Sequence, residues 1–206
     1  MKKTVAILLT SGSALLAGCG GEGSEARNSM AGTISNAPAL AAYVGTWQTP
    51  CDGHERQVLV VALQADGSGA LELTPATETY LKAGCSGPVL ATETLSAKIG
   101  AVPDGVADIV IKLSGSDVAA SVRIDKLTLS IPAYTFNVAG PGVEYVIHHE
   151  QQQWCTDHES GSTCVDDDGM HKAYTIAGGM VLSNNKLYTV VWNGSDYVPD
   201  TLYVKQ

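Results

Sequence analysis

The chain has 206 residues, 45% hydrophobic and 16% charged, which is enough for one sizeable core and excludes a disordered, charge-rich chain. With 12 basic and 21 acidic residues, its formal charge is −9. Nucleic acid is not expected as a partner, because phosphate binding needs a basic stripe and the sequence has none.

The first eighteen residues have the layout of a secretory signal peptide. Lys2 and Lys3 give a positive start, an interrupted apolar stretch follows, and small residues lead to a cysteine. A membrane-spanning helix needs about 20 mostly apolar residues, and the polar residues 10–13 break a stretch that is already too short. We therefore expect residues 1–18 to be removed on export.

Residues 16–19 read Leu-Ala-Gly-Cys and resemble the lipobox of bacterial lipoproteins. The resemblance implies cleavage before Cys19, a diacylglycerol on its thiol and usually acylation (palmitate, for example) of the new amino terminus. The alternative is an ordinary signal peptide in which Cys19 is incidental. In such lipoproteins an Asp after the cysteine favours the inner membrane, so Gly20 fits a lipid-anchored protein of the outer membrane.

The segment 19–42 is predicted to be the lipidated cysteine and a flexible tether, because it is rich in Gly, Ser, Ala and Asn and has no periodicity. A flexible chain of this length typically spans about 26 Å. Cleavage also removes two lysines, which leaves 10 basic and 21 acidic residues and a formal charge of −11. An acidic surface opposes adhesion to anionic lipid, so the anchor must hold the protein at the membrane.

The remaining four cysteines, Cys51, Cys85, Cys155 and Cys164, suggest two disulfides, because an even number in an exported chain is typical of bridges. Three pairings are possible, and we expect Cys51–Cys85 and Cys155–Cys164. The second pair flanks the polar stretch 156–163, which is predicted to be a hairpin loop. Free buried thiols are disfavoured in an oxidising compartment, and a four-cysteine zinc site is disfavoured because no C-x-x-C spacing occurs.

The folded part, residues 43–206, shows short strands separated by turns. Residues 107–113 alternate with one mostly apolar face, and so do residues 120–124 and 127–131. The apolar phase shifts by one residue between Ile124 and Leu127. A two-residue turn at Asp125-Lys126 would put all these apolar residues on one side, so the sequence predicts a hairpin there.

Two more turns are predicted near the C-terminus. Asn184 and Asn185 tolerate positive φ and separate strands at 180–182 and 187–192, and residues 193–196 turn the chain into a strand at 197–204. Other strands are expected at 57–64, 69–74, 89–97, 143–154 and 172–178. This pattern predicts an all-β domain, an antiparallel up-and-down barrel of about eight to ten strands, with a β-sandwich as the alternative. A closed barrel is favoured because closure of the sheet leaves no exposed strand edges.

Both ends of this domain resemble small bacterial lipocalin-like lipoproteins. Residues 43–47, Tyr-Val-Gly-Thr-Trp, look like the Gly-x-Trp start of lipocalin-like barrels, and the hairpin from Lys186 to Tyr203 resembles their closing strands. The resemblance leaves the middle of the domain unmatched. It implies a cup-shaped barrel able to hold an apolar ligand, and it leaves open whether the interior is hollow or filled.

Histidines and carboxylates cluster between residues 148 and 171. His148, His158, Asp168 and His171 are the weak candidates for metal ligands. Neighbouring His148 and His149 point to opposite faces of a strand, and the acidic run is more typical of a solvated loop, so neither a metal nor another cofactor is expected. No nucleophile elbow, His-Glu-x-x-His pair or phosphate loop occurs, and no catalytic residue is assigned.

The sequence thus predicts a non-enzymatic lipoprotein that binds a small apolar ligand or an envelope partner protein through its barrel. One alternative is a structural or interaction lipoprotein with a filled barrel. A metal-dependent hydrolase is the remaining alternative, and it would need the histidines and carboxylates to converge in a cleft.

Overall fold

The computed structural model describes residues 40–113, 118–148 and 150–206, all of which belong to one unit that spans residues 34–206. The predicted signal peptide, Cys19 and nearly all of the predicted tether lie outside these residues. Within the described ranges no helix is long and apolar enough to cross a membrane. The helical segment η1 (Ala41–Tyr43) is a single 3-10 turn.

Strands dominate the described residues, which confirms the predicted all-β class. They are β1 (Gly45–Gln48), β2 (Glu55–Leu63), β3 (Leu71–Lys82), β4 (Ser86–Leu95), β5 (Ile99–Ile111), β6 (Ala120–Ile131), β7 (Phe136–Ala139), β8 (Val143–His148), β9 (Gln151–His158), β10 (Gly161–Asp166), β11 (Tyr174–Ser183), β12 (Lys186–Trp192) and β13 (Tyr197–Lys205). Ten of them form one antiparallel sheet, and β8, β9 and β10 form a second, three-stranded sheet.

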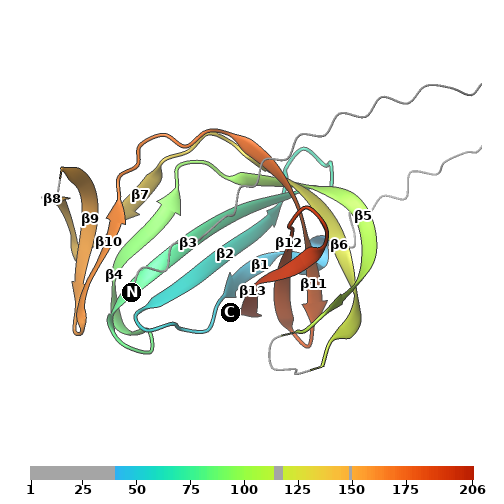
Figure 1. Ribbon diagram of the computed structural model, residues 1–206, viewed down its shortest axis with the longest axis horizontal. Helices are drawn as coiled ribbons and strands as arrows, with labels where there is room; N and C mark the ends of the chain where they lie inside the picture. The colour runs from blue at the N-terminus through green and yellow to red at the C-terminus, as the bar shows by residue number, and fades with distance from the viewer. Residues whose placement is uncertain (1–39, 114–117, 149) are drawn as a thin grey trace, which may run out of the picture. The chain divides into compact units, whose positions relative to one another are not determined.

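The large sheet closes into a ring. Its order runs β2-β1-β13-β12-β11-β6-β5-β3, and β2 pairs again with β3, so eight strands form a closed antiparallel circuit (Figure 1). Ring strands that follow one another in the sequence are also neighbours in the sheet. This is the up-and-down barrel arrangement that the sequence predicts.

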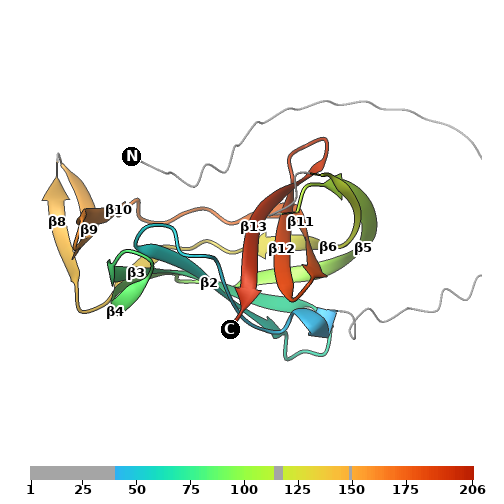
Figure 2. The same ribbon diagram turned by 90° about the horizontal axis from the view of Figure 1, so that it is seen from below.

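One end of β3 leaves the ring. Residues Leu71–Leu73 pair with β5, whereas β3 pairs with β4 between Ala76 and Lys82, and β4 in turn pairs with β7. Strand β7 and the three-stranded sheet come from one long insertion between β6 and β11, residues 132–173. Figures 1 and 2 show β3, β4 and β7 extending from the ring toward β8, β9 and β10.

The ring strands bury apolar side chains on both faces. All eight ring strands and η1 contribute to a first core, which therefore fills the interior: Leu40, Tyr43, Trp47, Leu59, Val61, Leu71, Leu73, Ala101, Leu127, Met180, Leu187 and Tyr203. A second core on the opposite face contains Ile111, Ile124, Val181, Tyr188 and Val190. A bulge between Pro103 and Val106 helps β5 and β6 to curve around this second core (Figure 2).

The predicted turn at Asp125-Lys126 is wrong. Strand β6 runs without a break from Ala120 to Ile131. The apolar phase shifts there because Ile124 points into the second core and Leu127 points into the first. A single long strand that passes between two cores has the same pattern as a hairpin with one apolar face.

The predicted strand at 143–154 is two strands, β8 and β9. The expected loop at 156–163 is mostly strand as well, because β9 and β10 continue to His158 and Gly161 and leave Glu159 and Ser160 as the turn. The two C-terminal turns are confirmed. Asn184 and Asn185 both have positive φ, 50° and 60°, and the side-chain oxygen of Asn193 accepts hydrogen bonds from the backbone of Ser195 and Asp196.

Candidate functional site

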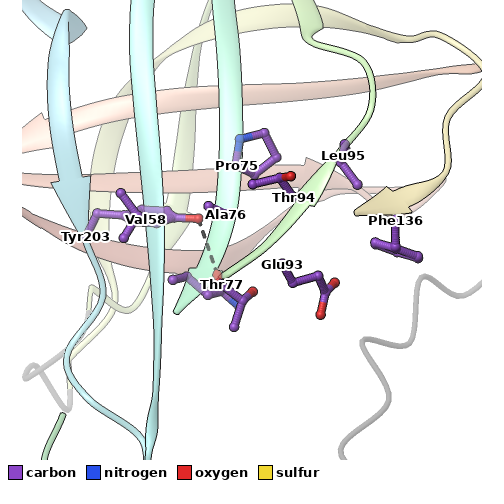
Figure 3. A pocket seen from close by; sticks show the side chains of 10 residues that line it. Val58, Pro75, Ala76, Thr77, Glu93, Thr94, Leu95, Phe136 and Tyr203 are labelled. Carbon is purple, nitrogen blue, oxygen red and sulfur yellow. Dashed lines mark hydrogen bonds between the residues drawn. The ribbon is translucent and has the colours of Figure 1, made fainter. Parts of the chain in front are cut away.

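A pocket of about 180 Å³ lies at the edge of the ring, where β3 and β4 extend beyond it. Its walls come from β2, β3, β4, β7 and β13, and Figure 3 shows the lining side chains. The residues that line it are Gln57, Val58, Pro75, Ala76, Thr77, Glu93, Thr94, Leu95, Phe136 and Tyr203.

The pocket continues the interior face of the ring. Gln57 pairs with Thr77, and Thr77 pairs with Glu93, so the three side chains form a row across β2, β3 and β4. Leu59, two residues along β2 from Gln57, belongs to the first core. Side chains two residues apart on a strand share a face. The row therefore faces the same way as the packed interior.

Tyr203 joins the first core to the pocket. Its ring packs in the core, and its hydroxyl donates a hydrogen bond to Oε1 of Gln57 at 3.4 Å (Figure 3). Burial, with a smaller contribution from the charge of Asp200, raises the pKa of Tyr203 to about 12. The phenol is therefore protonated at neutral pH.

Glu93 is the acidic side chain that lines this pocket, and it is partly buried. Burial raises the pKa of its carboxyl, and the negative charge of Glu55 raises it further. Among the residues that the structure describes, none makes a hydrogen bond or ion pair with this carboxylate. A partly desolvated carboxylate without a partner is unfavourable for folding, and such groups are often found at functional sites.

A second cluster lies where the β9–β10 turn meets β2 and β3. The rings of His54 and His158 stack with their centroids 4.0 Å apart. The hydroxyl of Ser160 lies 2.7 Å from Nε2 of His54 and 3.3 Å from Nδ1 of His158. We call these three residues the histidine junction.

With both imidazoles neutral, the hydrogen bonds of the histidine junction form one consistent chain of donors and acceptors. Nδ1 of His54 lies 3.2 Å from the carbonyl oxygen of Tyr80 and can only donate to it, so Nε2 accepts from Ser160. Nδ1 of His158 then donates to the Ser160 oxygen, and Nε2 of His158 accepts from the hydroxyl of Thr163, 3.2 Å away. This chain of hydrogen bonds links His54, before β2, to Thr163 of β10.

Burial lowers the pKa of His158, and the neighbouring His54 lowers it further, against the opposing effect of Glu55 and Asp157. Two contacts beside the junction add to the attachment of the three-stranded sheet. The backbone N–H of Glu159 donates to the carbonyl of Leu81, and its side chain pairs with Lys82 at 3.6 Å.

Both predicted disulfides, Cys51–Cys85 and Cys155–Cys164, are present. Cys51–Cys85 ties the segment before β2, which carries His54, to the β3–β4 turn. Cys155–Cys164 joins directly opposed residues of β9 and β10. The bridges therefore brace the two elements that meet at the histidine junction.

The four metal-ligand candidates have different surroundings. His158 belongs to the histidine junction, whereas the ring of His171 stacks on Tyr134 with centroids 4.8 Å apart. Asp168 is exposed and lines a second pocket of about 310 Å³ on the three-stranded sheet. Only the backbone of His148 is described, in β8. Among the side chains that the structure describes, which leave out that of His148, no three of His, Cys, Asp or Glu lie close enough to hold a metal ion.

Sequence reasoning missed Glu93, Tyr203, His54 and Ser160. A signal for Glu93 was present, because it lies between Ala91 and Leu95 on one face of an expected strand, where a carboxylate breaks an apolar row. The histidine junction left no comparable signal, since His54 and Ser160 are 106 residues apart.

No known protein family, no curated protein and no solved structure matches this chain.

Proposed function

We propose that this protein is a lipid-anchored lipoprotein of the outer membrane that binds an envelope partner and has no catalytic role. In this proposal Cys19 carries the lipid, residues 20–42 form the tether, and the all-β domain presents the pocket of Figure 3 to the partner. The observation that carries the proposal is an open pocket at the edge of a ring whose interior is packed, with a carboxylate, Glu93, that no described residue pairs.

The packed interior supports a binding partner at the edge of the ring over a ligand inside it. Side chains from every ring strand meet in the first core. Pockets for drug-sized ligands usually measure about 300–1,000 Å³, whereas the pocket at Glu93 measures about 180 Å³. This volume suits one side chain of a larger molecule. The small apolar ligand is the second candidate, because Pro75, Leu95 and Phe136 supply apolar walls.

Position-specific photocrosslinking in cells tests the proposal. A benzophenone amino acid would replace Thr77, which lines the pocket, or Val102, which is 50% exposed on β5 and serves as the control. We expect the Thr77 form to give a discrete adduct with one envelope protein and the Val102 form to give none. The same adduct from both positions, or none from Thr77 in a membrane-attached protein, would contradict the proposal.

A further inference from the structure

None of the described residues that line the pocket is positively charged. Glu55 lies on the same face of β2 as Gln57, and its charge acts on Glu93, so two carboxylates face this region. The adjacent Arg56 points to the opposite face, where it donates to Gln48 and lies over the ring of Tyr80. No described cation pairs with Glu93.

The walls of the pocket combine apolar surface with hydrogen-bond acceptors. Pro75, Leu95 and Phe136 provide the apolar surface. Glu93, the side-chain oxygen of Gln57 and the hydroxyl of Thr77 lie in one row. An occupant that fits both parts has an aliphatic stem and a compact cationic end with several donors.

We propose that the pocket binds a lysine-type side chain of the partner, with the ammonium group against Glu93 and the aliphatic stem against Leu95 and Phe136. This inference rests on the proposed function and names its partner's chemistry. An ammonium is a compact point charge with three donors, which matches one carboxylate with neighbouring neutral acceptors. A guanidinium is planar and prefers a bidentate carboxylate.

The net negative charge of the whole chain also favours a cationic partner, and it acts over a longer range than Glu93. The mature chain carries a formal charge of −11 after loss of Lys2 and Lys3 from 12 basic residues against 21 acidic ones. Such a surface attracts basic partners and accelerates their association. The ammonium also gives the Glu93 carboxylate the partner that the described residues do not supply.

Binding should weaken in acid. Glu93 on β4 must be ionised to hold an ammonium, and burial and Glu55 on β2 shift its titration upward. Tyr203 on β13 stays neutral across this range. His158 on β9, which interacts electrostatically with Glu55, gains positive charge as the pH falls and opposes a cation further.

The test is a titration of the isotope-labelled mature chain, followed by NMR, with two matched probes. N-acetyl-lysine methylamide carries the ammonium, and N-acetyl-norleucine methylamide has the same stem without it. We expect the lysine probe to bind at least about tenfold more tightly at pH 7.5, which is about 1.4 kcal/mol. The backbone signals of Thr77, Thr94 and Leu95 should shift.

Two isosteric variants control for charge. Glu93→Gln should reduce the affinity for the lysine probe to that of the norleucine probe, whereas Glu144→Gln, at an exposed position on β8, removes the same charge and should leave the affinity unchanged. Both variants are first checked for the wild-type spectrum. Equal affinity of the two probes, or an unchanged affinity in Glu93→Gln, overturns the inference. Crosslinking from Thr77 can succeed in either case, so the proposed function is judged separately.

Discussion

The carboxylate of Glu93 affects the stability of the fold as well as the binding proposed for it. Its pKa is higher in the folded protein than the ordinary value of 4.5, so folding takes up a proton between those two values. The ionised form therefore costs stability at neutral pH, and this cost disappears as the pH falls below the ordinary value. The proposed binding needs the ionised carboxylate, whereas stability favours the protonated form.

We accordingly expect Glu93→Gln to raise the melting temperature by a few degrees at pH 7.5, because it removes an uncompensated charge. The difference should shrink as the pH falls and vanish below about pH 4, where the wild-type carboxyl is protonated. Thermal unfolding of both proteins from pH 4 to pH 8 measures this. A variant that is less stable at pH 7.5 would mean that Glu93 has a stabilising partner.

Strand β6 contributes side chains to both cores. Substitutions of Ile124 and of Leu127 should therefore affect the free energy of unfolding independently. Each is 1% exposed, and the two side chains point to opposite faces of one sheet. We expect Ile124→Ala and Leu127→Ala each to lower the free energy of unfolding by about 2–5 kcal/mol. The loss in the double variant should equal the sum within about 0.5 kcal/mol.

Urea denaturation of the four proteins gives this double-mutant cycle. In the hairpin that the sequence suggests, the same two residues would be cross-strand neighbours and their effects would be coupled. A coupling well above 0.5 kcal/mol would therefore refute the continuous strand.

The contacts that attach the three-stranded sheet to the rest of the domain include His158, whose charge depends on pH. The pKa of His158 is lower in the folded protein than its ordinary value of 6.5, so the stability that His158 contributes is present above that value and is lost as the pH falls through the folded pKa. Protonation of His158 also places a positive charge beside the His54 ring, whose centroid is 4.0 Å away. Acid should therefore loosen this attachment before it unfolds the ring.

Hydrogen exchange measures this loosening. After correction for intrinsic rates, we expect the amides of β9 and β10 to lose protection between pH 7.5 and pH 5, and those of β11 and β12 to keep theirs. His158→Gln should remove most of this pH dependence. Equal loss of protection in β9 and β11 would show that the histidine junction is not the responsive element.

Turns were more predictable from the sequence than which strands pair with each other and in which register. The turn at Asn184 and Asn185 was predictable because its residue types are those that tolerate positive φ. The course of β6 was not, because alternation shows which residues share a face and not how many cores the sheet has. Glu93 belongs to a pocket only because β4 lies beside β3 in one particular register. Such register depends on contacts between distant segments.

At the scale of the whole molecule, the predicted anchor decides where the pocket acts. We expect the wild-type protein to lack residues 1–18, to carry acyl mass on Cys19 and to fractionate with the outer membrane. Cys19→Ser should be released into the soluble fraction, because the acidic domain has little affinity for anionic lipid. Mass spectrometry and fractionation measure both. A Cys19→Ser protein that remains fully with the membrane would exclude lipidation as the means of attachment.

Closure of the ring has a mechanical consequence for a domain held by its N-terminus. The chain enters β1 directly after η1, and β1 has four residues and is the shortest strand of the ring. On one side β1 meets β13 only through Trp47 and Gln48, with one more bond from Gln206 to Thr46. Under the proposed anchoring, a pull between the N-terminus and a bound partner acts on this short seam, and the seam contributes to the force that the domain withstands before the ring opens.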